Sequence, residues 1–174
     1  IRDAKIDTLY EGTTAIQGMD FFFRKIVRNQ GQALTALAEE IKKFLAGEPG
    51  GDALAAPREQ LAKAAADLEA IVGVMLTDLA ATEKDVKSLY KVGLNTTPFL
   101  LASGDVITAY LLLRGAAVAA AKLPEATGDD RPFYEGKIAA ARFFAATVLP
   151  HLAAVRATAE ATDLSLMELP EEAF

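Results

Sequence analysis

One carboxylate, Glu11, stands in a short segment that could carry acid–base chemistry. Gly12 follows it, and glycine permits unusual backbone angles and the close approach of a ligand. The next residues, Thr14-Ala-Ile-Gln17, fit a capping box, so a helix is expected to begin near residue 14. The free N–H groups at a helix start attract anions such as phosphates. The segment predicts an acid–base group beside a phosphorylated ligand, or simply a turn before a capped helix.

The residues around Glu11 belong to a longer pattern. Arg2-Asp-Ala-Lys-Ile6 precedes Leu9-Tyr-Glu-Gly-Thr13, and Ile16-Gln17 follows. In order and spacing this pattern resembles the signature near the C-terminal end of acyl-CoA dehydrogenases, a family that binds FAD. The remainder resembles the extra C-terminal helical domain of long bacterial members, including methylthiopropionyl-CoA dehydrogenases and related broad-chain enzymes. That second resemblance depends mainly on Lys84-Asp-Val86, Asn95 to Phe99 and Leu166 to Phe174.

The resemblance implies a role for each residue of the segment. Glu11 would be the base that removes the α-proton of an acyl thioester, while FAD accepts a hydride from the β-carbon and a trans-2-enoyl-CoA forms. Gly12 would lie against the substrate, and the Glu11 backbone N–H would contact the thioester oxygen. Thr13, Thr14 and Ala15 would lie near FAD, although many family members have a polar residue where this chain has Ala15.

The resemblance also implies partners. They are an acyl-CoA substrate, an electron-transferring flavoprotein or similar acceptor, and further copies of the chain in a homo-oligomer. The flavin pocket would be built mainly by domains that this chain lacks, so the 174-residue chain alone is expected to be inactive. The first 30 residues would end the catalytic helical domain, and residues 31–174 would form the additional helical-bundle domain.

Composition limits the other classes of function. The net charge of −6 disfavours a broad nucleic-acid surface, since an acidic protein repels phosphate backbones. The chain has no cysteine, which excludes disulfides and thiol chemistry and suits a reducing, cytoplasmic location. The apolar stretch from Val106 to Leu123 is interrupted by Arg114 and Lys122, so we expect a buried helix of a soluble protein rather than a transmembrane segment.

Hydrophobic spacing predicts an all-α fold. Apolar residues recur at intervals of three and four, and no run alternates long enough for a strand. We expect an antiparallel bundle of about four long helices, preceded by two short ones. The long helices are predicted at 32–46, 54–91, 98–123 and 132–161, and the short ones at 1–8 and 14–29.

Prolines sharpen these boundaries. Pro57, Pro98 and Pro132 are each expected in the first turn of a helix, where a missing N–H costs nothing. Pro150 is expected to kink the last helix, because it removes a backbone hydrogen bond. The tail from Leu164 is expected either to pack as an irregular arm or to stay mobile.

Other residues that could do chemistry have simpler explanations. The only histidine, His151, lacks the Glu-x-x-His spacing of a di-iron bundle, so a surface role is expected. Ser88 and Ser103 have no histidine partner at a spacing that suggests a hydrolase. Phe21-Phe-Phe23 could bound an acyl pocket, but helix packing is favoured. Arg24, which could meet a phosphate, is equally well explained by surface pairing.

Two further hypotheses remain open besides the enzyme. The first is a non-catalytic all-α interaction or oligomerisation domain, and the second is a helical ligand-binding bundle. The sequence encoded upstream separates the first from the enzyme, and calorimetry against long-chain acyl-CoA tests the second.

Overall fold

The computed structural model describes residues 13–173, and over this range it is all helical, without a β-strand. Its elements in chain order are α2 (Thr14–Asp20), the π-helix η2 (Phe21–Val27), α3 (Gln32–Ala46), η3 (Gly51–Leu54), α4 (Ala55–Ala81), α5 (Ser88–Lys122), η4 (Leu123–Glu125), α6 (Asp130–Thr147), α7 (His151–Ala161), η5 (Ser165–Glu168) and η6 (Glu171–Ala173). The predicted all-α class is confirmed. The helix predicted at 1–8 lies outside the described residues.

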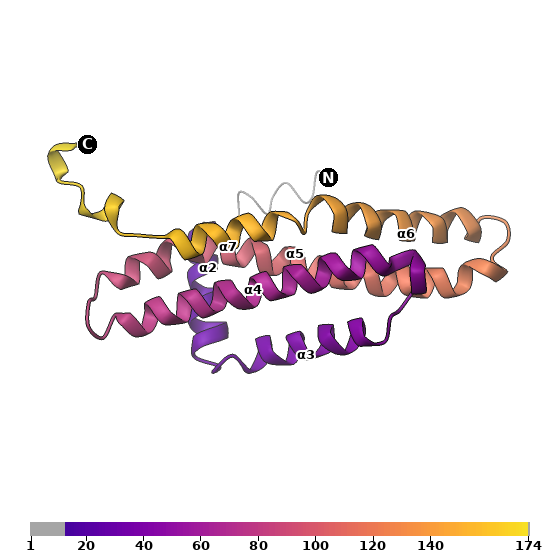
Figure 1. Ribbon diagram of the computed structural model, residues 1–174, viewed down its shortest axis with the longest axis horizontal. Helices are drawn as coiled ribbons and strands as arrows, with labels where there is room; N and C mark the ends of the chain where they lie inside the picture. The colour runs from indigo at the N-terminus through magenta and orange to yellow at the C-terminus, as the bar shows by residue number, and fades with distance from the viewer. Residues whose placement is uncertain (1–12, 174) are drawn as a thin grey trace.

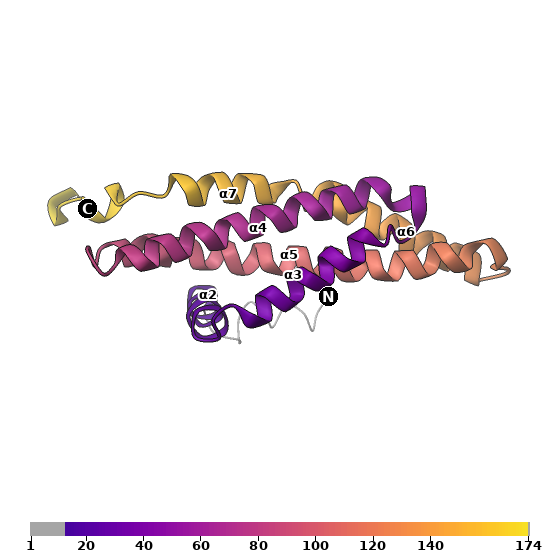
Figure 2. The ribbon, with the colours of Figure 1, turned by 60° about the horizontal axis from the view of Figure 1, so that its bottom comes forward.

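The bundle is built on α4 and α5, which lie side by side and run antiparallel (Figure 1). The α6 and α7 helices return along this pair and complete the packing, while α3 lies outside α4. Both α2 and η2 run across the long helices rather than along them, as Figure 2 also shows. The fully buried side chains include Leu61, Ile71, Met75, Phe99, Leu113 and Leu152. Each such side chain contributes about 1.5–3 kcal/mol through burial.

The predicted helix at 54–91 is two helices, and this prediction was wrong. The chain reverses between Ala81 and Ser88 without glycine or proline. Side chains make the turn instead. The Thr82 hydroxyl donates to the Leu79 carbonyl at 2.6 Å, and an Asp85 carboxylate oxygen accepts from the Lys87 N–H at 3.0 Å. These local hydrogen bonds compete with the helical pattern and end α4.

Pro98 lies inside α5, so its predicted place in a first turn was also wrong. It has no N–H to donate to the Leu94 carbonyl, which is normally a substantial cost. Tertiary packing compensates, because Val92 and Phe99 on either side are both fully buried. Pro57 and Pro132, by contrast, lie in the first turns of α4 and α6 as predicted.

Pro150 does more than kink a helix. The α6 helix ends at Thr147, and α7 begins at His151 with Pro150 as its N-cap, so the predicted continuous helix at 132–161 is interrupted. Leu149 in this interruption remains buried, which keeps the break against the core. Beyond α7 the chain leaves the bundle as an exposed arm with two short 3₁₀ turns, as predicted (Figure 1).

Two segments, Ser88–Glu125 and Asp130–Glu168, are long and apolar enough to cross a membrane by length and composition alone. The first contains α5, whose inner face packs in the bundle core and includes buried Asn95 and Ser103. The second is divided by the break between α6 and α7. Core packing accounts for the apolar inner face of α5 but leaves its outer face unexplained.

Candidate active-site segment at the start of helix α2

The segment with predicted chemistry leads into a capped helix. Thr13 has an extended backbone, and its hydroxyl accepts a hydrogen bond from the Ile16 N–H at 3.3 Å. The cap is therefore Thr13, one residue earlier than the predicted Thr14. The helix itself begins at Thr14, as expected. Within an α-helix the first N–H groups have no helical acceptor, so those of Thr14 and Ala15 can serve an anion.

The predicted site residues fall on both sides of the described boundary. Glu11 and Gly12 lie outside the described residues, and their roles remain predictions. Thr13, Thr14 and Ala15 are described, and all three are exposed. They are thus open to groups from outside this chain.

Close backbone packing fixes the position of α2. Gly18 is buried, and a Cβ added there would lie 2.9 Å from the backbone carbon and oxygen of Thr96 and 3.0 Å from the Thr97 nitrogen. No side chain fits in that space without a shift of one helix. Gly18 therefore sets how closely α2 approaches α5.

Aromatic side chains hold the next turn. Phe22 of η2 is fully buried, with its ring centroid 6.0 Å from that of Phe99 in an edge-on arrangement. Phe21 lies 5.3 Å from Phe99, and Phe23 lies 5.2 Å from Phe22. The core-packing interpretation of this cluster is confirmed, and the cluster anchors the end of α2 to α5.

The π-helix itself is unusual at seven residues, since π-helical structure is rare and occurs mostly as single turns at functional sites. Its wider turns are visible in the hydrogen bonds from the Arg28 N–H to the Phe23 carbonyl and from the Gly31 N–H to the Ile26 carbonyl. A turn over residues 28–31 follows the π-helix, and its last two residues, Gln30 and Gly31, both have positive φ. Within the π-helix the rings of Phe21 and Phe22 meet Phe99 of α5, and the ring of Phe23 meets that of Phe22.

Arg24 forms an ion pair with Asp20, four residues earlier, which agrees with the surface-pairing interpretation. Its guanidinium lies 2.6 Å from one oxygen of Asp20 and donates to the other at 2.8 Å. The hydrogen bond from Arg24 lowers the pKa of the Asp20 carboxyl. Because both groups are exposed, the pair mainly fixes side-chain positions on this surface.

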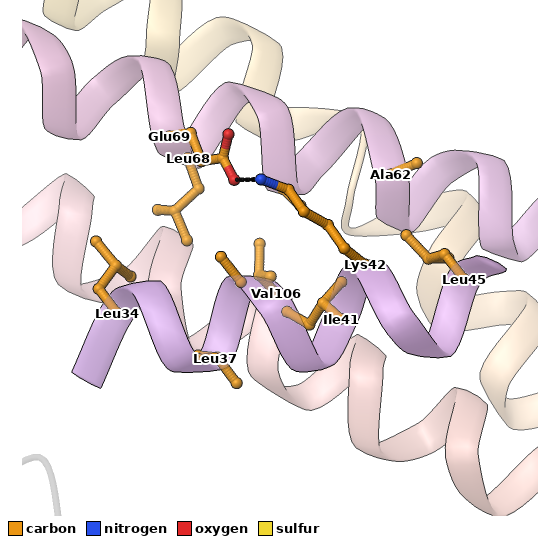
Figure 3. Close-up of a pocket in the computed structure, with 11 residues that line it drawn as sticks. Leu34, Leu37, Ile41, Lys42, Leu45, Ala62, Leu68, Glu69 and Val106 are labelled. Atoms are coloured by element: carbon orange, nitrogen blue, oxygen red, sulfur yellow. Dashed lines mark ion pairs between the residues drawn. The ribbon is translucent and has the colours of Figure 1, made fainter. Parts of the chain in front are cut away.

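An apolar groove of about 240 Å³ lies beneath α3 (Figure 3). It is bounded by Leu34, Leu37 and Ile41 on α3 and by Leu68 on α4, with Val106 of α5 at its base. At its edge the Lys42 ammonium lies 2.9 Å from Glu69, so α3 is tied to α4 by an exposed ion pair. The charged residues of its lining, Lys42 and Glu69, pair with each other at the exposed edge, and the rest of the lining is apolar, so the groove is suited to holding apolar groups.

The remaining candidates have structural roles. His151 is exposed at the start of α7, and the described residues contain no cluster of His, Cys, Asp or Glu able to hold a metal. The buried Ser103 hydroxyl donates to the Phe99 carbonyl at 2.8 Å. Asn95, in a glycosylation-like motif, is buried and donates to the Thr162 hydroxyl at 3.1 Å. None of the three lies in a catalytic arrangement among the described residues.

Two contacts were not predicted from the sequence: the close approach of Gly18 to α5 and the hydrogen bond between Asn95 and Thr162. The close approach at Gly18 had a signal, because an isolated glycine inside a helical pattern often marks tight packing. The Asn95–Thr162 hydrogen bond joins residues 67 positions apart and had no local signal.

Comparison with known proteins identifies similar chains. Residues 37–170 match the family model described as "Acetyl-CoA dehydrogenase C-terminal like". The whole chain is 51% identical to the broad-specificity linear acyl-CoA dehydrogenase FadE5 of Mycobacterium tuberculosis. Over 99% of its length it is 34% identical to a butyryl-CoA dehydrogenase of Syntrophomonas wolfei. Over 95% it is 36% identical to the 3-methylmercaptopropionyl-CoA dehydrogenase of Ruegeria pomeroyi.

These relatives are much longer than the chain. The aligned region covers 29% of the Mycobacterium protein, 28% of the Syntrophomonas protein and 27% of the Ruegeria protein. The similarity to the Mycobacterium protein extends over the whole chain, so it includes residues 1–36, which precede the matched family domain.

Proposed function

Since the chain belongs to the acyl-CoA dehydrogenase family, we propose that it is the C-terminal part of a flavin-dependent enzyme that oxidises an acyl-CoA to a trans-2-enoyl-CoA. The observation that carries the proposal is the 51% identity over the entire chain, which includes the Glu11 segment. The names of the relatives share an acyl-CoA substrate and differ in the acyl group. The proposal therefore leaves the acyl group open.

Glu11 is proposed to be the base. Its carboxylate takes the proton of the C–H bond next to the thioester carbonyl, and that bond's electron pair becomes the α,β double bond. The FAD of the full-length protein would supply the oxidising chemistry by accepting the hydride that leaves the β-carbon. A carboxylate covered by an apolar acyl chain loses water and becomes a stronger base, which suits it to so weak an acid.

The backbone has a part in the same step. As the α-proton leaves, negative charge develops on the thioester oxygen, and hydrogen-bond donors aimed at it lower the barrier. The Glu11 N–H is proposed as one donor. Gly12, without a side chain, would let the substrate lie against the chain here.

Thr13, Thr14 and Ala15 are proposed to contact FAD. The described geometry fits such a group in part, because the first turn of α2 is exposed and its N–H groups suit an anionic phosphate. The Thr13 hydroxyl oxygen already accepts a hydrogen bond from the Ile16 N–H. A contact between this oxygen and the cofactor would have to leave that hydrogen bond in place. Ala15 offers only its backbone and a methyl group.

We also propose how the full-length protein works. It would act in the cytoplasm as a homo-oligomer and pass electrons to an electron-transferring flavoprotein or a similar acceptor. The 174-residue chain alone would be inactive, because Glu11 would lack the flavin pocket around it.

The test uses the complete reading frame. The purified protein should show flavin absorbance that bleaches when acyl-CoA is added without an acceptor. Glu11→Gln should keep the flavin and lose most turnover, while Glu40→Gln, on an exposed site of α3, should change neither. A colourless protein that reduces no acceptor would refute the proposed function, and full activity in Glu11→Gln would show that the base lies elsewhere.

A further inference from the structure

The outer face of α5 is apolar, and beyond the point where α2 crosses the helix no described residue covers it. We define it by its exposed residues Leu94, Leu101, Gly104, Thr108, Leu111, Gly115 and Val118. At 3.6 residues per turn they fall within about a third of the helix circumference and extend over about 36 Å. The three leucines and the valine are 49–59% exposed, and no member of the face is charged. A contiguous apolar surface of this kind marks an interaction site more often than a solvated one.

Among the described residues, nothing packs against the glycines of this helix. Gly93, Gly104 and Gly115 recur every eleven residues, and a Cβ added at any of them would meet nothing within 4 Å. Glycine is the poorest helix former after proline, so an exposed helix is better served by alanine at such positions. Small residues between exposed leucines leave shallow depressions into which side chains of another helix can pack.

One helix from the N-terminal side already crosses α5 beside this face. Gly18 of α2 meets the backbone of Thr96 and Thr97, which lie between Leu94 and Leu101 in the sequence. On α2 itself, Ile16 is 62% exposed and Met19 is 48% exposed. The apolar surface is thus continuous with a contact that joins the active-site segment to the bundle.

We propose that the outer face of α5 is the surface on which the upstream, flavin-bearing part of the same polypeptide docks. This inference rests on the proposed function, because it requires the chain to be part of a longer dehydrogenase. The relatives named above carry more than two thirds of their length outside the aligned region. The upstream part would join this domain through the segment that leads into α2, and the contact of α2 with α5 adjoins the face that contains Leu101 and Leu111.

Two other occupants are less suited to the surface. Helices that lie on membranes usually carry many Lys and Arg residues along their polar flanks. Between Lys91 and Arg114, however, α5 has no basic residue and one acidic residue, Asp105. A second copy of the chain could pair two outer faces, but its α2 and η2 would have to avoid the α2 that already crosses α5.

Thiol labelling of the full-length protein tests the proposal without requiring activity. The described chain has no cysteine, so Leu101→Cys and Leu111→Cys each add one thiol to this domain. Matched controls are Phe143→Cys on α6 and Leu166→Cys in the C-terminal arm, whose parent side chains are about 70% exposed. In the native full-length protein, the thiols at 101 and 111 should react with a maleimide at least ten times more slowly than the control thiols. Equal rates would overturn the proposal.

A photo-crosslinking amino acid at Thr108 identifies what covers the face. The expected product has the mass of one polypeptide and joins position 108 to a peptide upstream of Ile1. A dimer-sized product would instead show that another copy covers the face. Transfer of the label to phospholipid, in vesicles of phosphatidylcholine and phosphatidylglycerol, would show a membrane contact. Either of these outcomes would overturn the proposal, and neither depends on whether the flavin turns over.

Discussion

Replacing Phe22 with alanine tests whether the bundle positions the candidate active-site segment. Phe22 is fully buried, and its ring meets those of Phe99 and Phe23 at centroid distances of 6.0 and 5.2 Å. Truncating a buried phenylalanine removes its transfer free energy and leaves a cavity, which together cost about 3–5 kcal/mol. For a chain of this length, that cost corresponds to a fall in Tm of about 6–20 °C.

Phe143→Ala is the matched control, because it makes the same chemical change at a side chain that is 70% exposed. Its free energy of unfolding should stay within about 0.5 kcal/mol of the parent. Urea unfolding followed by circular dichroism gives both values, provided the m-values agree. If Phe22→Ala cost less than about 1 kcal/mol, like the control, η2 would not be anchored on α5 and the reasoning would fail.

Three further perturbations follow from the same contacts. In the 174-residue chain, Gly18→Leu should separate α2 from α5 and cost about 1–3 kcal/mol of unfolding free energy. Gly104→Leu in the same chain should cost nothing, because nothing lies within 4 Å of a Cβ added there. Equal effects of the two substitutions in thermal melts would contradict the close approach of α2 to α5. Asn95→Ala should cost about 1–3 kcal/mol, because it removes a buried amide and its hydrogen bond to Thr162; an unchanged midpoint in urea would refute this. Burial raises the pKa of the Asp105 carboxyl, so the folded state binds its proton more tightly than the unfolded state, and stability falls as pH rises through the folded pKa. Asp105→Asn should therefore raise the Tm at pH 7 and leave it nearly unchanged at pH 3; a gain of equal size at both pH values would exclude that cause.

Helix boundaries were predicted correctly where glycine marks the end of a helix in the sequence. The helix at 32–46 was predicted correctly, because an apolar stripe marks it and Gly47 directly follows it. The turn between Ala81 and Ser88 was missed, since threonine and aspartate side chains make it rather than glycine or proline. Boundaries made by side-chain hydrogen bonds have a much weaker sequence pattern.

Tertiary packing decided the proline positions. Pro98 fits inside α5 because buried neighbours hold the helix on both sides of the missing hydrogen bond. Pro150 ends a helix because α7 can restart directly after it, with Leu149 still in the core. Proline therefore lies within a continuous helix at position 98 and separates two helices at position 150, and the packing around each residue accounts for the difference.

The candidate site was predicted from its sequence motif, whereas the packing contacts that position it were not predicted. The helix start near residue 14 followed from capping chemistry, although the capping residue proved to be Thr13. The placement of that helix depends on Gly18 and Phe22 meeting α5, about 80 residues further along the chain. Contacts between such distant segments have no local pattern from which to predict them.

The most direct test of the proposed function is anaerobic titration of the full-length Glu11→Gln protein with acyl-CoA. If Glu11 removes the α-proton, the variant should bind substrate with a shift of its flavin spectrum, yet the flavin should stay oxidised while the parent is bleached. Bleaching of the variant at the parental rate would contradict the role assigned to Glu11.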